Sequence, residues 1–535
     1  MSRLRRIAGA PRRVVGALRR YGPRNVWRFG ADMVKRHGVE GALRYAVAPA
    51  HVRAERLEEM SRPPPPPPPK LLKGFDAAWS LAPEQWAEHA VRRTHVREPR
   101  PEDPAVHVLF GATAPPPGAA DADWVVLLAP GDRPAEDLAA RIAAAGAEPC
   151  VEVVSFDMTF TGPNGRVTPV LQPGANPWLA RYADVGLGRY ALRAGVLRGE
   201  EGDAYARVRA WLAARTLNAA RSRWRHVFEP LAEIAATGED VAAARRAAVA
   251  RARAELRPGG GDESVSVVIC THNRGRLVRQ LVRALVALGP RISEVVVVAN
   301  NTSTPPALET LDWVRSLPHG RVLVRDEPFN FSRFCNAAVA HTTGERLLFL
   351  NDDITPISDD WLEPLLAPLR DPDVGIAGSL LLYPDERVQH AGIFLGFRES
   401  AGHALRGARL PEQEHLFYGS VPREVSATTG AVMMVKRDLY EALNGFDELL
   451  PTYLQDVDIC MRAGAVGQAT VWTPLSELLH MESTTILEDG GASLSAIRPR
   501  ERDRFLARWG GRLLRDPFHN PRFDVEDESF RTLRA

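Results

Sequence analysis

The stretch from residue 264 to residue 301 restricts the fold of this chain more than any other part of the sequence. It runs SVSVVICTHNR, then GRLVRQLVRALVAL and, after a short connection, EVVVVANN. The outer segments are β-branched and lack polar alternation, as is typical of strands buried on both faces, whereas the middle segment has helical spacing. A strand, a helix and a strand in this order predict a parallel βαβ unit. We therefore expect an α/β fold, with a mostly parallel sheet flanked by helices.

Polar residues follow each predicted strand at the point where it ends. Thr271 and Asn273 follow the first apolar run, and Asn300 ends the second. A third run, LLFLN, leads directly into the adjacent pair Asp352 and Asp353. Because the carboxyl ends of parallel strands meet at one edge of a sheet, and ligands bind at that edge, we expect these side chains to lie close together.

The carboxylate pair at the end of the third run needs a physical explanation. Two adjacent carboxylates repel each other and lose hydration when a strand brings them into the protein. A divalent cation or hydrogen-bond donors would offset this cost, and oxygen ligands suit Mg²⁺ or Mn²⁺. An Asp-Asp pair also occurs in solvated turns. The pair alone therefore does not decide between a cation site and a turn.

The length of 535 residues predicts more than one domain. Seven consecutive prolines at 63–69 form an extended spacer, and the glycines of RPGGGDES mark a second boundary. The chain then divides into a basic N-terminal helical segment at 1–62, a polyproline linker at 63–73, an α/β domain at 74–202, a helical linker at 203–263 and the βαβ-containing domain at 264–535.

The net charge of +2 hides a basic N-terminus, because residues 1–36 carry eleven Lys or Arg and one Asp. Interleaved arginines and apolar residues favour a helix on an anionic membrane surface, although a helix packed on its own domain has the same pattern. We expect no nucleic acid partner. No apolar run is long enough to span a bilayer, no signal peptide is evident, and the four cysteines are widely spaced. We therefore expect a cytoplasmic protein, with peripheral attachment to the inner face of the cytoplasmic membrane as a hypothesis.

Five further segments occur in a characteristic order: FNFSRFCNAAVAHTTGERLLFLNDDI, VQHAGIFLG, VSATTGAVMMVKRDLYEALNGFDE, YLQDVDICMR and LLHMEST. In order and spacing they resemble the family 2 glycosyltransferases of the GT-A fold, and within them the rhamnosyltransferase-like branch that builds bacterial surface polysaccharides. The resemblance covers about 264–525. It implies a GT-A domain that uses a nucleotide sugar and Mg²⁺ or Mn²⁺.

The resemblance also implies roles for individual residues. Asp353, with Asp352 beside it, matches the family's metal and diphosphate motif, and His480 of HMES matches its later metal-ligating histidine. Asp456 of QDVD stands where the family has its catalytic base, and we expect Asp458 to be structural. The residues that match nucleotide-facing positions are Thr271, Asn273, Arg274 and Asn336. His390 and His403 either line the acceptor side or pack in the core.

Two departures from the family pattern bear on chemistry and specificity. Gln455 replaces the usual glutamate before Asp456, which removes a charge beside the expected base. Ala299 stands where the family usually ends its second strand in an aspartate that faces the nucleobase. Asn300 is the neighbour that could accept a hydrogen bond from a pyrimidine ring N–H, so we expect a uridine or thymidine diphosphate donor, UDP- or dTDP-linked.

Part of the first half resembles the same family in degraded form. WVVLLAPGDRPAEDLAARI, starting at Trp124, matches the strand, the carboxylate motif and the following helix, but of the motif only Asp132 remains. No first βαβ unit is evident before it. We expect a partial, inactive GT-A-like domain with a structural or acceptor-positioning role.

The leading hypothesis is a metal-dependent inverting glycosyltransferase that acts on a surface polysaccharide or a lipid-linked glycan. A non-catalytic scaffold with the same fold is the alternative, and the intact Asp353, Asp456 and His480 argue against it. A nucleotidyltransferase would also use paired carboxylates, but the sequence lacks the Gly- and Arg-rich phosphate loop expected near the first strand.

Overall fold

A computed structural model describes residues 103–534, apart from 112–113, 163, 199–201, 237, 257–261, 398–399, 412–414, 482–490 and 514. Every described residue belongs to one compact unit, Leu71–Ala535. The predictions for the basic segment and the polyproline linker fall outside the described residues. No helix among the described residues is long and apolar enough to cross a membrane.

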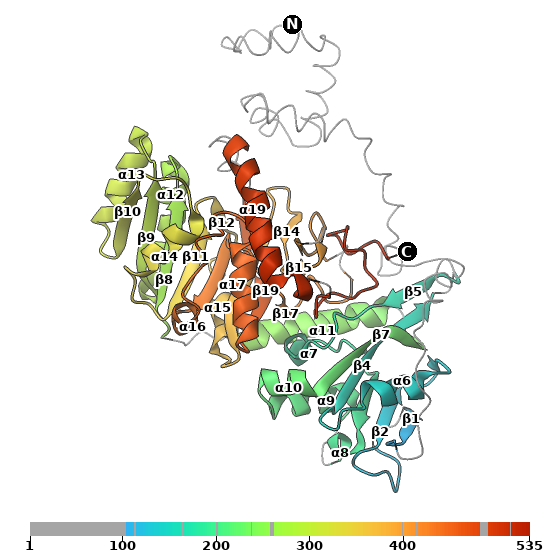
Figure 1. Ribbon diagram of the computed structural model, residues 1–535. Coiled ribbons are helices and arrows are strands. Elements are labelled where there is room, and N and C mark those ends of the chain that lie inside the picture. Colours follow the sequence, from blue (N-terminus) through green and yellow to red (C-terminus); the bar gives the residue numbers. More distant parts are fainter. Residues whose placement is uncertain are drawn as a thin grey trace, which may run out of the picture. The chain divides into compact units, whose positions relative to one another are not determined.

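The C-terminal half is built on a ten-stranded mixed sheet with the order β10-β9-β8-β11-β18-β13-β19-β12 (Figure 1). The first four strands are parallel, β18 runs antiparallel to both of its neighbours, and β13 and β19 are again parallel. The strands are β8 (Val265–Thr271), β9 (Ile292–Asn300), β10 (Gly320–Arg325), β11 (Arg346–Asn351), β12 (Ile354–Pro356), β13 (Val374–Leu382), β18 (Val432–Lys436) and β19 (Ala469–His480), with β14 (Val388–His390) on β13 and β17 (Arg423–Val425) on β19. A separate hairpin pairs β15 (Ile393–Leu395) with β16 (Ala401–His403).

Helices cover both faces of the parallel strands, which confirms the βαβ prediction. Val267 of β8 belongs to the same core cluster as Leu281 of α12 (Gly275–Ala287). The next residue, Val268, belongs to a second cluster with Phe334 of α14 (Phe331–Val339). Alternate side chains of one strand therefore enter two apolar layers, as expected for a strand buried on both faces. The other helices of this half are α13 (Pro305–Ser316), α15 (Glu363–Leu366), α16 (Arg437–Ala442), α17 (Gln455–Ala465) and α19 (Gly491–Trp509).

The first half contains a seven-stranded sheet that repeats the topology of the second. Its order is β1-β2-β6-β4-β7-β3, with β5 on β4, and each pair runs in the same sense as its counterpart in β8-β11-β18-β13-β19-β12, with β14 on β13. Strand β1 takes the place of β8, so a single strand does precede the degraded motif. Among the described residues, β9 and β10 have no counterpart. The strands are β1 (Val106–Phe110), β2 (Trp124–Leu128), β3 (Arg133–Pro134), β4 (Val153–Thr161), β5 (Val167–Val170), β6 (Tyr190–Arg193) and β7 (Trp224–Glu233).

The expectation of a purely helical linker at 203–263 was wrong. This region contains α9 (Ala204–Ala213), α10 (Leu217–Arg223) and α11 (Gly238–Leu256), but also the ten-residue strand β7. Because β7 pairs in parallel with β4, it is part of the first sheet. Its sequence, WRHVFEPLAE, has a proline and several charges without alternation, so the pattern did not predict a strand.

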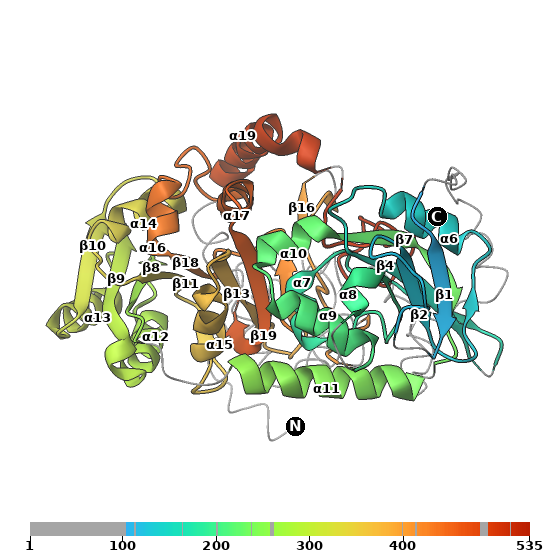
Figure 2. The same cartoon turned by 90° about the horizontal axis from the view of Figure 1, so that it is seen from below.

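Buried polar contacts join the two halves. His415 accepts a hydrogen bond of 3.0 Å from the Leu171 N–H, and Asn520 donates one of 2.8 Å to Asp157. Glu424 on β17 accepts from the backbone N–H of Trp178 in α7 (Pro177–Tyr182) at 3.2 Å. Helix α11, the long helix in Figure 2, also packs against α7. The remaining helices of the first half are α6 (Leu138–Ala145) and α8 (Ala194–Leu197).

Candidate active site

The carboxylate pair lies where β11 ends, beside the end of β8, as the sequence predicted. Thr271 Oγ1 donates a hydrogen bond of 2.7 Å to Asp352 Oδ2, and Arg274 Nη1 lies 3.2 Å from Asp352 Oδ1 and 3.5 Å from Asp353 Oδ2. Both carboxylates are buried. Burial raises the pKa of Asp352 to about 6, with Asp353 adding to the shift, while Arg274 and Thr271 act in the opposite direction.

His480 meets this pair from the end of β19. The pairing of Ile354 in β12 with His480 brings the imidazole to Asp353, where Nε2 lies 3.1 Å from Oδ1. On the other side of the ring, Nδ1 lies 2.7 Å from Gln389 Oε1. Burial alone would raise the pKa of Asp353, but the hydrogen bond and charge of His480, together with Arg274, outweigh it and lower that pKa below its usual value.

The geometry of Asp353 and His480 fits a divalent cation. Because an amide oxygen only accepts, Nδ1 of His480 carries a proton. When the ring is charged, Nε2–H donates to the Asp353 carboxylate, and when the ring is neutral, the lone pair of Nε2 faces that carboxylate. Two acceptors at 3.1 Å need a proton or a cation between them. Adjacent ligands of an octahedral ion with bonds of about 2.1 Å lie about 3.0 Å apart. The described residues contain no group of three or more His, Cys, Asp or Glu side chains that could hold an ion by themselves.

Arg274 directly precedes α12, and its guanidinium lies beside the carboxylate pair with one nitrogen unbonded within the described part of the chain. Its side chain is only 8% exposed, and Nη1 is engaged with the two carboxylates. Its Nη2 is buried and has no hydrogen-bond partner among the described residues. A buried guanidinium nitrogen without an acceptor is costly, so this atom marks a place for an anionic ligand.

The two asparagines expected near the nucleotide differ in what they can offer. Asn300 donates both amide protons, to the carbonyl oxygens of Arg325 and Glu327 at 2.8 Å each, so its oxygen is the group left for a ligand. Asn273, with a positive φ of 52°, accepts from the N–H groups of Ser303 and Thr304 at 2.8 and 2.9 Å. Asn273 therefore fixes the loop before α13, and Asn300 is the better placed of the two for base recognition.

Asn336 has a structural environment that differs from the expected one. Its side-chain oxygen accepts from the Tyr440 hydroxyl at 2.6 Å and the Phe446 N–H at 2.9 Å. Its amide nitrogen lies 3.0 Å from the Phe446 carbonyl and 3.2 Å from Glu448 Oε1. With these bonds Asn336 fastens α14 to the loop after α16, and nothing in its placement supports a nucleotide contact.

Asp456 stands in the first turn of α17 and is anchored next to the carboxylate strand. The Gly430 N–H donates to Asp456 Oδ2 at 2.9 Å, and the neighbouring Ala431 carbonyl accepts from the Asn351 N–H, also at 2.9 Å. The loop before β18 therefore links the carboxylate of Asp456 to the residue that precedes Asp352. Burial raises the pKa of Asp456, while backbone N–H groups partly oppose the shift.

The structure confirms that Asp458 is structural. It is fully buried, and it accepts hydrogen bonds from Arg462 at 2.8 Å, from Arg508 at 2.6 Å and from the Trp509 indole at 2.9 Å. These contacts fasten α19 to α17. His390 is also buried. Its Nε2 lies 3.0 Å from Thr428 Oγ1, two residues before Gly430, and its Nδ1 lies 3.0 Å from His403 Nδ1.

Part of the chain matches a known protein family. Residues 266–436 match the family described as Glycosyl transferase family 2. These residues form a family 2 glycosyl transferase domain.

The chain is similar to three curated bacterial proteins. The chain is 34% identical over 283 residues to the uncharacterized protein y4gI of Sinorhizobium fredii and 33% identical over 276 residues to the O-antigen biosynthesis protein RfbC of Myxococcus xanthus. These alignments cover 51% and 49% of the chain but only 31% and 20% of the two relatives. It is also 26% identical over 254 residues to the N-acetylglucosaminyl-diphospho-decaprenol L-rhamnosyltransferase of Mycobacterium tuberculosis, covering 43% of the chain and 80% of that protein.

Among solved structures, the chain is similar to a mannosyltransferase from Pyrobaculum calidifontis in complex with GDP-Man and Mn²⁺. The sequence identity is 18% and the TM-score 0.30, with 46% of the chain and 69% of that structure covered. The GT-A-type α/β fold expected for the glycosyl transferase domain is confirmed by the family match and by the mixed sheet with its parallel βαβ start.

The equivalent position in the first half of the chain is blocked. Asp132 directly precedes β3, as Asp353 directly precedes β12. Its carboxylate accepts two hydrogen bonds from Arg189, at 2.9 and 3.0 Å, and one each from the Ala129 and Ala235 N–H groups at 2.8 Å. All four contacts come from the protein itself, so the buried Asp132 is already satisfied.

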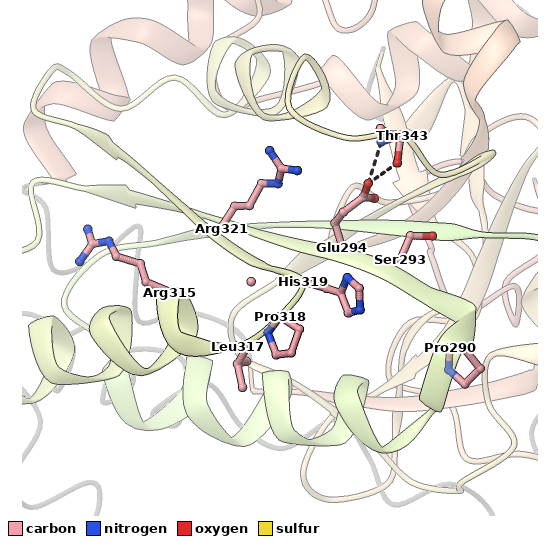
Figure 3. Close-up of a pocket in the computed structure, with 10 residues that line it drawn as sticks. Pro290, Ser293, Glu294, Arg315, Leu317, Pro318, His319, Arg321 and Thr343 are labelled. Atoms are coloured by element: carbon pink, nitrogen blue, oxygen red, sulfur yellow. Dashed lines mark hydrogen bonds between the residues drawn. The ribbon is translucent and has the colours of Figure 1, made fainter.

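A surface hollow elsewhere in the glycosyl transferase domain is not part of this site. It has a volume of about 640 Å³ and is lined by residues at the amino ends of β9 and β10 (Figure 3). The carboxylates, in contrast, follow the carboxyl end of β11. Glu294 in this hollow bonds to Thr343, which holds the carboxylate against the neighbouring loop. We assign it no role in catalysis.

Proposed function

We propose that the chain is a metal-dependent inverting glycosyltransferase that moves a sugar from a nucleoside diphosphate to a polysaccharide or lipid-linked glycan. The observation that carries this proposal is the facing pair of Asp353 and His480, 3.1 Å apart, with the carboxylate of Asp456 anchored to the adjoining loop. A non-catalytic scaffold would not need a buried carboxylate pair, a facing imidazole and a separate, partly buried acid.

The donor diphosphate would lie between the carboxylate pair and the start of α12. Asp353 and His480 would hold a Mg²⁺ or Mn²⁺ ion, whose remaining ligands would include phosphate oxygens, as is usual for such ions. The bound ion would neutralise charge that develops on the leaving diphosphate. The free Nη2 of Arg274 is positioned to donate to the same anion. Asp352, held by Thr271 and Arg274, keeps this arginine oriented.

Asp456 is the proposed general base. The acceptor hydroxyl oxygen attacks the anomeric carbon as the bond from that carbon to the diphosphate oxygen breaks, and the hydroxyl proton passes to the Asp456 carboxylate. Burial raises the pKa of Asp456, which makes this carboxylate a stronger proton acceptor than an exposed aspartate. No covalent nucleophile is needed, so one displacement inverts the anomeric centre.

The donor class and the acceptor class are further parts of the proposal. The oxygen of Asn300 supports a uridine or thymidine diphosphate donor, because both bases present a ring N–H. The names of the relatives, an O-antigen biosynthesis protein and a diphospho-decaprenol rhamnosyltransferase, support a cell-surface glycan or its lipid-linked precursor as the acceptor. Because the chain spans less than a third of the first two relatives, the acceptor is inferred from this domain alone.

For the location, we propose a cytoplasmic enzyme attached to the inner face of the cytoplasmic membrane through basic residues 1–36. Each Lys or Arg near an anionic surface contributes about 1 kcal/mol, so the attachment should be sensitive to salt. The full chain should co-sediment with phosphatidylglycerol vesicles at low salt and be released at high salt. Equal sedimentation by a chain that starts at residue 74 would contradict the proposal.

The proposed activity can be tested by screening nucleotide sugars with Mn²⁺ or Mg²⁺. Asp353→Ala and His480→Ala should each abolish metal-dependent turnover and weaken calorimetric binding of uridine diphosphate with Mn²⁺. Asp359→Asn, at an exposed carboxylate outside the site, is the matched control and should behave as the wild type. Unchanged metal and diphosphate binding in both site variants would rule out the metal assignment.

A further inference from the structure

The side chain of Gln389 reaches the candidate metal site because of an irregularity in a strand. In the antiparallel pair of β13 and β14, Leu381 pairs with His390 and Leu382 pairs with Val388. Gln389 is therefore an extra residue without a partner opposite, which defines a β-bulge. Bulges redirect a side chain out of the normal alternation, and here the buried Gln389 meets His480 at 2.7 Å.

The contact between Gln389 and His480 fixes which ring nitrogen is available. Gln389 Oε1 accepts the proton of His480 Nδ1, so the neutral imidazole keeps its lone pair on Nε2. Nε2 is the atom that lies 3.1 Å from the Asp353 carboxylate. The amide nitrogen of Asn351, 3.3 Å from Nε2, is also arranged to donate to that lone pair. Two independent neighbours thus favour the same tautomer.

We propose that Gln389 is a positioning residue that sets the tautomer and orientation of His480 so that Nε2 can bind the divalent ion. This inference rests on the proposed function, because it assumes that Asp353 and His480 hold the metal. A ligating histidine commonly donates its second nitrogen to an oxygen acceptor, which increases its basicity and fixes its ring. Gln389 does so without a charge, which leaves Asp353 as the negative group that faces the cation.

The proposal is tested by Mn²⁺ binding, followed by electron paramagnetic resonance in the presence of uridine diphosphate. Loss of such a neighbour typically weakens metal affinity by about 10- to 100-fold, and we expect this loss in Gln389→Leu. Gln389→Glu keeps an oxygen acceptor for Nδ1–H and should bind Mn²⁺ within a few-fold of the wild type. Gln468→Leu, at a glutamine that bonds the Pro372 carbonyl away from the site, is the control and should be unchanged.

Two results would overturn the inference in distinguishable ways. If His480→Ala weakens Mn²⁺ binding but Gln389→Leu does not, the metal site stands and the role of Gln389 is wrong. If His480→Ala binds Mn²⁺ like the wild type, the metal assignment and the inference both fail. A ¹⁵N spectrum of the wild-type chain, at a pH where His480 is neutral, checks the tautomer without any variant. A proton on Nε2 instead of Nδ1 would also overturn the inference.

Discussion

The Arg189 guanidinium makes two hydrogen bonds to Asp132, at 2.9 and 3.0 Å, at the position where the second sheet presents Asp353 to His480. Both carboxylates directly precede the short strand that pairs with the last long strand of their sheet. In the second half the partner of Asp353 is the imidazole of His480, and the two side chains together could bind a cation. In the first half the guanidinium of Arg189 already occupies the equivalent place beside Asp132. The same topology therefore forms a structural ion pair there.

We predict that Arg189→Met destabilises the chain without affecting the catalytic site. Removal of one partner of a buried ion pair costs about 3 to 5 kcal/mol, because the other charge is left uncompensated. The double variant Arg189→Met with Asp132→Leu should recover most of this loss in urea unfolding. Calorimetry should find one uridine diphosphate per folded chain in the wild type and in the double variant. Loss of nucleotide binding without loss of stability would show that the first half is a second binding site.

We predict that Asp456→Asn abolishes transfer while donor binding is retained. Loss of a positioned general base costs about 10² to 10⁴ in rate, and Asp456 acts on the acceptor proton instead of the nucleotide. Burial disfavours its charged form in the folded chain, so Asp456→Asn should unfold at the same urea concentration as the wild type or a higher one. Asp458→Asn is the contrasting variant and should lose stability, because it weakens three hydrogen bonds to a buried carboxylate. Near-normal turnover by Asp456→Asn would place the base elsewhere.

The pH dependence of turnover should reflect the environment of Asp456. A base works only when ionised, and burial raises its pKa above the value of about 3.9 for an unperturbed aspartate. The rate constant at saturation should therefore fall as the pH falls through this raised pKa, at a higher pH than an exposed aspartate would give. A turnover rate that stays constant down to pH 4 would contradict this role for Asp456.

The sequence predicted those parts of the site that depend on local pattern. Asp352 and Asp353 were found because a continuous apolar run ends on them, and the parallel sheet then brings Thr271 beside them. Gln389 was not found, because its role depends on a bulge whose partner strand lies several residues earlier in the chain. Asn336 was assigned to the nucleotide by motif position, but α16 and the loop after it use all of its hydrogen-bonding groups.

We predict that buried histidines make the fold sensitive to acid. Burial lowers the pKa of His415 to about 3 and outweighs the opposing effect of a backbone hydrogen bond with Leu171. Since an unfolded histidine titrates near 6.5, the unfolded state binds more protons below that pH, and stability falls as the pH falls from about 6.5 towards about 3. Between pH 7 and 5 one such histidine accounts for about 2 kcal/mol of lost stability.

His415→Gln isolates this effect, because its side-chain oxygen can still accept from Leu171. Urea unfolding at pH 7 and pH 5 should show a smaller loss for His415→Gln than for the wild type, by about 2 kcal/mol. The exposed His341 is the control, and His341→Gln should leave the difference between the two pH values unchanged. An equal acid sensitivity in His415→Gln and the wild type would mean that His415 is already charged in the folded state.

The last prediction concerns base recognition by Asn300. Both of its amide protons are donated to backbone carbonyls, so its oxygen is the group that can accept from the ring N–H of uracil or thymine. Loss of one buried hydrogen bond costs about 1 to 3 kcal/mol, so Asn300→Ala should weaken donor affinity roughly five- to a hundred-fold without changing turnover at saturation. Asn300→Asp keeps the acceptor but loses the two donors, and should retain more affinity than Asn300→Ala if the oxygen accepts from the base.

Asn301→Ala, at the exposed neighbour, is the control and should bind the donor as the wild type does. Titration of each variant with uridine, thymidine and guanosine diphosphates decides the matter. Tightest binding of guanosine diphosphate by the wild type, or equal affinities in Asn300→Ala and the wild type, would exclude Asn300 as the group that selects the base.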